Sequence, residues 1–182
     1  MEIEKTPIEG LLVITPRVFI DDRGYFLESF NARSLRDTEI STSFVQDNES
    51  KSTRGVIRGL HYQLNPDAQA KLVRVIEGIV FDVAVDLRKD SPTFGQWFGM
   101  ELSGDNKKQF YIPRGFAHGF SVLSETAIFA YKCDGYYDPK AERGIRYNDP
   151  ELNIDWQLDE EESIVSEKDL ANPLFQEAEY NF

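Results

Sequence analysis

The stretch Lys71-Leu-Val-Arg-Val-Ile-Glu-Gly-Ile-Val-Phe-Asp-Val-Ala-Val-Asp-Leu87 decides the fold of this chain. Two runs rich in β-branched residues flank Glu77-Gly78, and this arrangement predicts two strands joined in a tight β-hairpin. Side chains alternate between the faces of a strand. One set in the second run is expected to face a packed core: Phe81, Val83, Val85 and Leu87. The other set is expected to face a cavity or the surface: Asp82, Ala84 and Asp86.

The segments around this stretch also favour short strands over helices. Strands are predicted at residues 11–15, 17–20, 25–30, 44–49, 54–63, 96–102, 109–112, 120–123 and 126–132. Pro113 to His118 is expected to be a compact turn, and the spacing alone does not bring Asp82 to His118. Asn31 is expected to cap a short helix from Ala32 to Asp37, and a second short helix is expected near Ser166 to Leu170.

Many short strands separated by turns are typical of a sandwich or a barrel. We predict an all-β fold, a cupin-type double-stranded β-helix jelly roll with a few short helices. Residues 1–182 are expected to form a single domain with its jelly-roll core at about residues 20–135. The N-terminal strands and a C-terminal segment with short helices are expected to pack on that core.

Composition excludes several classes of function. The formal net charge of the 182 residues is -12, which argues against a general nucleic-acid surface. An anionic ligand still fits if a few Arg and Lys side chains converge. The single cysteine, Cys133, fits a reducing compartment. The acidic start and the absence of an apolar run long enough to span a bilayer predict a cytoplasmic protein.

The stretch Arg54-Gly-Val-Ile-Arg-Gly-Leu-His-Tyr-Gln63 places basic and titratable side chains among glycines. In a regular strand His61 and Gln63 share one face and Arg58 lies on the other, unless a kink at a glycine changes this. Only two histidines occur in the chain, so His61 is one of few groups able to transfer protons at neutral pH. The alternative for His61 is a hydrogen-bonded histidine in the core.

Metal and nucleophilic chemistry find weaker support. Pro113-x-Gly-x-x-His118 is similar to the second cupin metal motif, but His61-Tyr-Gln63 carries glutamine where that motif's partner has a second histidine. Two histidines cannot build a three-histidine site, so we expect no functional metal. Cys133 is expected to be a buried, inert thiol. The chain has no Gly-x-Ser-x-Gly elbow, phosphate loop or dinucleotide fingerprint.

General acid–base chemistry remains. It requires a base, an acid and a group that stabilises developing negative charge. His61 offers the base, Tyr131 a phenol that can donate a proton, and Lys71 a cation for an oxyanion. A strand tyrosine is more often a packing residue and a strand-end lysine is more often solvated. The hypothesis therefore depends on all three meeting in one cavity.

Nine motifs together resemble one enzyme family. They are Asp22-Arg-Gly-Tyr-Phe-x-Glu28, Gln46-Asp-Asn48, Gly55-x-x-Arg-Gly-Leu-His-Tyr-Gln63, Gln69-x-Lys71, Phe81-Asp-Val-x-Val-Asp-Leu-Arg88, Ser91-Pro-Thr-Phe-Gly95, Pro113-x-Gly-Phe-x-His-Gly-Phe120, Tyr136-Tyr-x-Pro139 and Glu142-x-Gly144. From about Ile8 to Pro173 the chain resembles the dTDP-4-dehydrorhamnose 3,5-epimerase family. The main departure is Tyr147, where many relatives are expected to have tryptophan.

The resemblance implies a cofactor-independent isomerase with a metal-free cupin fold. Its substrate would be dTDP-4-dehydro-6-deoxy-D-glucose, inverted at carbons 3 and 5 during the biosynthesis of dTDP-L-rhamnose, a precursor for lipopolysaccharide and O-antigen. The implied assembly is a homodimer that exchanges N-terminal strands, with no nucleic acid and no membrane as partner.

The resemblance also implies residue roles. His61 would be the proton acceptor, Asp169 the carboxylate that orients it, Tyr131 the proton donor on the opposite face of the sugar, and Lys71 the cation near the ketone oxygen. Arg23 and Glu28 would reach into the partner's site. The positions implied to bind substrate are Arg23, Phe26, Glu28, Gln46, Asp47, Asn48, Arg58, Lys71, His118, Tyr137, Glu142 and Lys168.

Three alternatives stay open at this point. The first is an epimerase that acts at carbon 3 only or carbon 5 only. The second is a non-catalytic cupin that binds a nucleotide sugar. The third is a metal-dependent cupin oxygenase.

Overall fold

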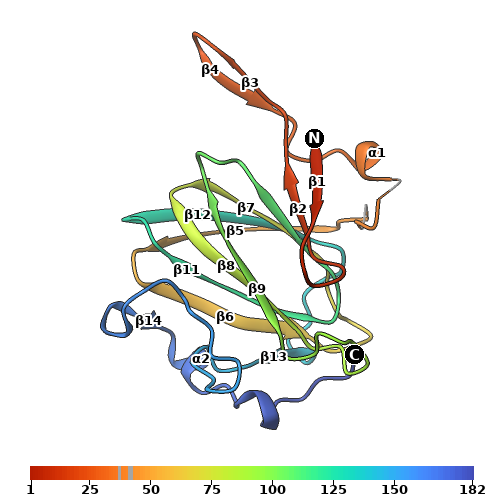
Figure 1. Ribbon diagram of the computed structural model, residues 1–182, viewed down its shortest axis with the longest axis vertical. Helices are drawn as coiled ribbons and strands as arrows, with labels where there is room; N and C mark the ends of the chain where they lie inside the picture. Colours follow the sequence, from red (N-terminus) through yellow and green to blue (C-terminus); the bar gives the residue numbers. More distant parts are fainter. Residues whose placement is uncertain (37, 41–42) are drawn as a thin grey trace.

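The computed structural model describes residues 1–36, 38–40 and 43–182 as two packed β-sheets and a projecting hairpin (Figure 1). The first six-stranded sheet has the order β1-β2-β10-β7-β12-β5, and the second has the order β13-β6-β11-β8-β9 with β14 parallel to β6. The projecting hairpin consists of β3 and β4. The strands are β1 (Glu2–Lys5), β2 (Leu12–Thr15), β3 (Val18–Asp21), β4 (Gly24–Leu27), β5 (Gln46–Thr53), β6 (Val56–Gln63), β7 (Lys71–Glu77), β8 (Ile79–Asp86), β9 (Trp97–Ser103), β10 (Gln109–Ile112), β11 (Phe116–Val122), β12 (Thr126–Cys133), β13 (Glu142–Gly144) and β14 (Ile164–Val165).

Helices are short, as expected. They are α1 (Ala32–Leu35), α2 (Glu167–Leu170) and the two 3₁₀ turns η1 (Glu160–Glu162) and η2 (Phe175–Glu177). Asn31 caps α1 by accepting a bond from the Arg33 backbone N–H, and Ser166 caps α2 in the same way through Asp169. Asp37, the predicted end of the first helix, lies outside the described residues. The prediction of an all-β cupin jelly roll with a few short helices is confirmed.

The predicted hairpin at Glu77-Gly78 is wrong, although both strands exist. β7 belongs to the first sheet, between β10 and β12, whereas β8 belongs to the second, between β11 and β9. A two-residue hairpin turn of type I′ requires positive φ at both central residues. Only Gly78 of the pair has it, with φ of 84°. The chain therefore turns a corner from one sheet to the other at Gly78.

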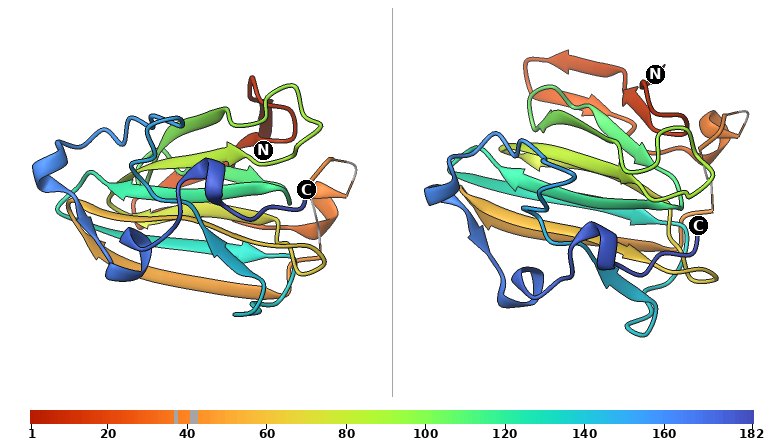
Figure 2. Two further views of the ribbon diagram at one scale, coloured as in Figure 1. Left: turned by 90° about the horizontal axis from the view of Figure 1, so that it is seen from below. Right: turned by 60° about the horizontal axis from the view of Figure 1, so that its bottom comes forward.

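Two hydrophobic clusters, one on each side of the second sheet, stabilise the fold. The cluster between the sheets contains Phe110, Phe129 and Ala84, and Phe129 stacks on Phe120 with ring centroids 4.2 Å apart. The cluster on the outer side holds the predicted core set Val83, Val85 and Leu87, with Phe81 partly buried at its edge. Both faces of β8 are therefore buried, because the C-terminal segment covers the outer face of this sheet (Figure 2).

The expected turn from Pro113 to His118 is corrected at its second half. β11 begins at Phe116 and includes His118, because this segment pairs with both β8 and β6. Pairing on two sides outweighs the local turn preference of Pro113 and Gly115. The sequence also did not indicate three short strands, β1, β13 and β14.

A bulge in β6 changes which side chains share a face. His61 lies opposite His118, but Arg58 lies opposite Phe120, so three steps along β6 match two steps along β11. The extra residue lies at Gly59, whose φ is 129°. Because opposed residues on paired strands point to the same face, Arg58 and His61 both point between the sheets. The kink that the glycines allowed is therefore present.

The β3–β4 hairpin stands away from the two sheets (Figure 1). Its side chains are largely solvated, and Phe26 is 69% exposed. Among the described residues, no helix has both the length and the apolar character needed to cross a bilayer.

Candidate active site

A histidine–carboxylate pair joins two distant parts of the chain. His61 Nε2 lies 2.6 Å from Oδ1 of Asp169, and the side chain of His61 is 33% exposed whereas that of Asp169 is 6% exposed. The Gly59 backbone N–H donates to Oδ2 of Asp169 at 3.5 Å. Burial raises the pKa of Asp169, but the bonds from His61, Gly59 and Ser166 outweigh it, so the net pKa is lowered. Asp169 is therefore a carboxylate at neutral pH and accepts a hydrogen bond from His61.

His61, Lys71 and Tyr131 line one cavity of about 230 Å³ between the sheets. His61 comes from β6 of the second sheet, whereas Lys71 and Tyr131 come from β7 and β12 of the first. The Lys71 Nζ atom lies 3.5 Å from the His61 carbonyl oxygen and 5.9 Å from the Tyr131 ring centroid. The three groups that acid–base chemistry requires thus meet in one cavity.

Burial sets the protonation of two of these groups. Burial raises the pKa of Tyr131, which keeps the phenol protonated and able to donate. Burial lowers the pKa of Lys71, although Cys133, Asp82 and Glu142 act in the opposite direction. When protonated, a lysine in such surroundings is a weakly solvated cation, which stabilises an oxyanion more strongly than a solvated one does.

Polar side chains line this cavity, and Lys168 reaches one of them from the neighbouring helix α2. Glu142 accepts bonds from the Tyr137 hydroxyl at 2.8 Å and from Lys168 Nζ at 2.7 Å. Gln46 Nε2 donates to Asn48 Oδ1 at 3.0 Å, and both line the cavity. These five residues are among the predicted substrate-binding positions.

A second cavity of about 430 Å³ adjoins the first at His61. Arg58, Lys168 and Asp169 line it, together with Ser166 and residues of β14. Arg58 Nε donates to Ser52 Oγ at 3.1 Å, and its other guanidinium nitrogens form no hydrogen bond with the residues that the structure describes. Two cations at one side of the proton-transfer pair are suited to an anionic group.

Three predicted positions lie on or beside the projecting hairpin. Arg23 bonds to Asp21 at the tip, Phe26 is exposed on β4, and Glu28 accepts a bond from Asn31 Nδ2 at 3.0 Å. In this chain these side chains belong to the hairpin and its base and do not line the cavity that holds His61.

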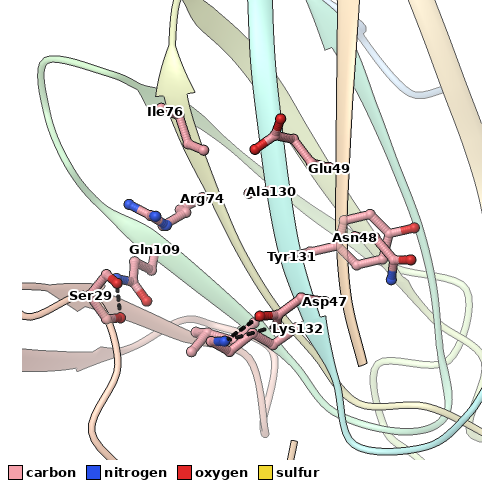
Figure 3. A pocket seen from close by; sticks show the side chains of 11 residues that line it. Ser29, Asp47, Asn48, Glu49, Arg74, Ile76, Gln109, Ala130, Tyr131 and Lys132 are labelled. Carbon is pink, nitrogen blue, oxygen red and sulfur yellow. Dashed lines mark hydrogen bonds and ion pairs between the residues drawn. The ribbon is translucent and has the colours of Figure 1, made fainter. Parts of the chain in front are cut away.

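Asp47 and His118 also lie outside that cavity. Asp47 forms an ion pair with Lys132 at 2.8 Å in a cavity of about 390 Å³ on the outer side of the first sheet, which shares Asn48 and Tyr131 with the cavity of His61 (Figure 3). His118 is 6% exposed, and its Nε2 contacts both carboxylate oxygens of Asp82 at 3.0 Å. Asp82 therefore points inward and contacts His118, an arrangement that the sequence spacing alone did not predict.

The structure adds residues that the motifs did not single out as site residues. Ser166 holds the backbone N–H of Asp169, and Gln63 and Gln69 line the cavity. Cys133 lines it too, and its buried thiol has a raised pKa because of burial, as expected for an inert thiol. Among the described residues, no group of three or more His, Cys, Asp or Glu is arranged to hold a metal ion. Metal-independent activity stays a prediction.

Comparison with known proteins agrees with this geometry. The family model described as dTDP-4-dehydrorhamnose 3,5-epimerase matches residues 5–177. The Pseudomonas aeruginosa dTDP-4-dehydrorhamnose 3,5-epimerase is 53% identical over 180 residues, which cover 98% of each chain. A crystal structure of dTDP-4-dehydrorhamnose 3,5-epimerase from Elizabethkingia anophelis is 54% identical, with a TM-score of 0.92 and 97% of each chain covered.

A further solved relative carries a ligand. The Legionella pneumophila dTDP-6-deoxy-D-glucose-3,5-epimerase, solved in complex with dTDP-4-keto-L-rhamnose, is 54% identical with a TM-score of 0.92. The match covers 97% of this chain and 93% of the relative. Similarity of this extent, over nearly the whole of both sequence and fold, shows that the chain belongs to the dTDP-4-dehydrorhamnose 3,5-epimerase family.

Proposed function

We propose that this protein is an epimerase that inverts carbons 3 and 5 of dTDP-4-dehydro-6-deoxy-D-glucose and forms dTDP-4-dehydro-L-rhamnose. The observation that carries the proposal is the shared cavity, with His61 on one sheet and Lys71 and Tyr131 on the other. Inversion requires a base and an acid on opposite faces of the sugar, since a proton returned to the same face restores the substrate.

The residues divide the chemistry as follows. Asp169 accepts the N–H of His61 Nε2, so Nδ1 is the nitrogen that takes the proton from the carbon next to the ketone. The electron pair of the broken C–H bond moves to the ketone oxygen, and the Lys71 ammonium stabilises the resulting enolate. The Tyr131 hydroxyl then donates its proton to the same carbon from the other face. Exchange with solvent restores both groups before the second carbon reacts.

The remaining cations and ring at the site suit the nucleotide part of the substrate. Arg58 and Lys168 supply positive charge for the diphosphate, within a chain whose net charge is negative. Tyr137 offers a half-exposed ring for the thymine ring of the nucleotide, and Gln46, Asn48 and Glu142 offer hydrogen bonds to the substrate. The ligand of the Legionella relative supports a dTDP-sugar as the substrate class.

The functional unit is proposed to be a homodimer in which the β3–β4 hairpin of each protomer completes the site of its partner. Arg23, Phe26 and Glu28 are predicted substrate-binding positions, yet they lie on or beside a hairpin that projects from its own protomer (Figure 1). Exposed aromatic residues on this hairpin, Phe19 and Phe26, are suited to an interface. We place the enzyme, as one domain over residues 1–182, in the cytoplasm, consistent with its single buried cysteine.

Proton NMR of the keto-sugar nucleotide in deuterium oxide tests the proposal. The wild-type protein should incorporate deuterium at carbons 3 and 5 and form the product inverted at both. His61→Asn should lose exchange at both carbons by about 10²–10⁴-fold, because one base serves both. Undiminished exchange in His61→Asn, or inversion of a single carbon by the wild type, would contradict the proposal.

A further inference from the structure

Three glutamine side chains converge on one loop beside the cavity. Gln46 begins β5, Gln63 ends β6, and Gln69 lies in the loop before β7. Their amides bond to the backbone of four consecutive residues, 135–138, on the loop that follows β12. No two of the three glutamines belong to the same element, so the convergence comes from the tertiary fold.

The amide side chains donate to the first two residues of this loop and accept from the last two. Gln69 Nε2 donates to the Gly135 carbonyl at 2.7 Å, and Gln63 Nε2 donates to the Tyr136 carbonyl at 3.2 Å. Gln46 Oε1 accepts the Tyr137 N–H at 3.0 Å, and Gln63 Oε1 accepts the Asp138 N–H at 2.8 Å. Every residue from 135 to 138 thus has its backbone held by an amide side chain.

The loop held in this way carries a residue of the site. The Tyr137 ring is 52% exposed, so packing alone does not fix it, while its hydroxyl bonds to Glu142. Gln63 is 5% exposed and also donates to the Asp67 carbonyl at 2.6 Å. A buried amide tied to two segments is a firm anchor for the backbone of an exposed loop.

Glutamine is the side chain that fits this task at position 63. Its amide offers two N–H donors and one carbonyl acceptor in one plane. Here it uses them on Asp67, Tyr136 and Asp138. A neutral imidazole has one donor and one acceptor and would leave one of these backbone groups unpaired.

We propose that Gln63 and Gln69, together with Gln46, form an amide clamp that fixes residues 135–138 and so holds the Tyr137 ring as a preformed wall of the substrate site. Gln63 and Gln69 are positioning residues, because they act on the substrate through the loop. The contribution to substrate binding rests on the proposed function, whereas the clamp itself does not.

Amide hydrogen exchange tests the clamp without any substrate. Gln63→Ala should accelerate exchange at the Asp138 N–H by about 2- to 10-fold, the loss expected for one hydrogen bond. Gln63→Glu keeps the acceptor and should preserve more of this protection. Gln176→Ala, a change at an exposed glutamine on η2 far along the chain from the loop, is the matched control. Unchanged exchange at Asp138 in folded Gln63→Ala protein would overturn the clamp.

Kinetics test its role in positioning. Gln63→Ala and, independently, the milder Gln69→Ala should raise KM for the nucleotide sugar while kcat changes little, because the Tyr137 ring is proposed to contact the nucleotide and not the carbons that lose protons. In a Tyr137→Ala background the same changes should have almost no further effect. If the effects of the glutamine variants and of Tyr137→Ala on KM simply add, the glutamines do not act through the Tyr137 ring. Faster exchange at Asp138 in a protein without epimerase activity would support the clamp and reject only the proposed reaction.

Discussion

The proposed role of Tyr131 depends on its hydroxyl group alone. Tyr131→Phe keeps the ring and its packing against Phe129, 6.0 Å away between centroids, but removes the proton. His61 and Lys71 still form the enolate, so deuterium exchange should persist better than formation of inverted product. The measurement is the ratio of deuterium incorporated to epimer formed, in wild type and variant. If the ratio does not rise while both rates stay intact, Tyr131 is only a packing residue and Tyr137 is the next candidate.

Burial of the Lys71 ammonium in the site lowers the stability of the folded protein. Its pKa is lowered by burial, so the folded protein binds that proton less tightly than the unfolded chain does. Below the pKa of Lys71 in the folded protein, the cost of burying its cation is fully present and lowers the stability. Between that pKa and 10.5 the folded protein releases the proton while the unfolded chain keeps it, so the stability rises with pH.

Lys71→Met should therefore stabilise the protein at neutral pH while it abolishes turnover. We expect a gain of about 1 kcal/mol, or about 2–4 °C in Tm, because function-related strain is released. Thermal unfolding at pH 7 and at pH 10 gives the comparison, and the gain should shrink at the higher pH. A lower Tm for Lys71→Met at pH 7 would show that the attraction of Asp82 and Glu142 outweighs burial.

Sequence reasoning identified the chemical groups of the site better than their surroundings. His61 was indicated because the chain has only two histidines. Lys71 and Tyr131 were indicated because acid–base chemistry requires a cation and a proton donor. Their meeting depends on opposite sheets, which no local pattern encodes. Asp169 followed only from the resemblance, because it lies 108 positions from His61. The roles of Gln63 and Gln69 were missed because amide bonds to a distant loop leave no signature in spacing.

At the scale of elements, Gly144 on β13 packs against Asn172, which follows the helix α2 that carries Asp169. Gly144 lies opposite His61 in the β13–β6 register. A Cβ atom there would lie 2.3 Å from Nδ2 and 2.6 Å from Cγ of Asn172. Asn172 follows α2 and donates its backbone N–H to the Asp169 carbonyl at 3.3 Å. The absence of a side chain at Gly144 therefore leaves room for the Asn172 amide beside β13.

Gly144→Ala should displace Asn172 and with it the carboxylate of Asp169. A shift of about 1 Å in such a pair lowers kcat/KM on the order of 10²-fold. Asn172→Ala removes the clashing atoms, so the Gly144→Ala/Asn172→Ala double variant should recover most of the activity. The single variant Asn172→Ala is the control, since the buried Nδ2 of Asn172 has no hydrogen-bond partner among the described residues. A double variant as impaired as Gly144→Ala alone would contradict this account.

Strand existence followed from the sequence more readily than strand pairing. The residues from 109 to 112 form the predicted strand, because four consecutive residues are buried between two neighbours. The corner at Gly78 was mistaken for a hairpin, because both require a glycine with positive φ between β-branched runs. β14 was missed because two residues, Ile164 and Val165, become a strand only by pairing with β6.

At the scale of the whole molecule, the proposed exchange of hairpins makes each site a product of two chains. Arg23→Ala and His61→Asn protomers should each form inactive or weakly active homodimers. When equal amounts of the two variants are unfolded, mixed and refolded, half of the dimers should contain one protomer of each kind. One of the two sites in such a dimer should then combine an intact Arg23 from one protomer with an intact His61 from the other. Recovered activity of about a quarter of wild type is expected. No recovery, with mixed dimers present, would show that Arg23 acts within its own protomer.

The distance along the chain between His61 and Asp169 has a consequence for biosynthesis. The ribosome releases β6 and most of both sheets well before residues 164–172 emerge, and domains begin to fold from the N-terminal side. A nascent chain can thus assemble its sandwich while its histidine still lacks the carboxylate. Proton abstraction at full rate begins only after Asp169 has left the ribosome, so a ribosome-stalled chain that ends before Ser166 should exchange protons of the substrate more slowly than the released protein.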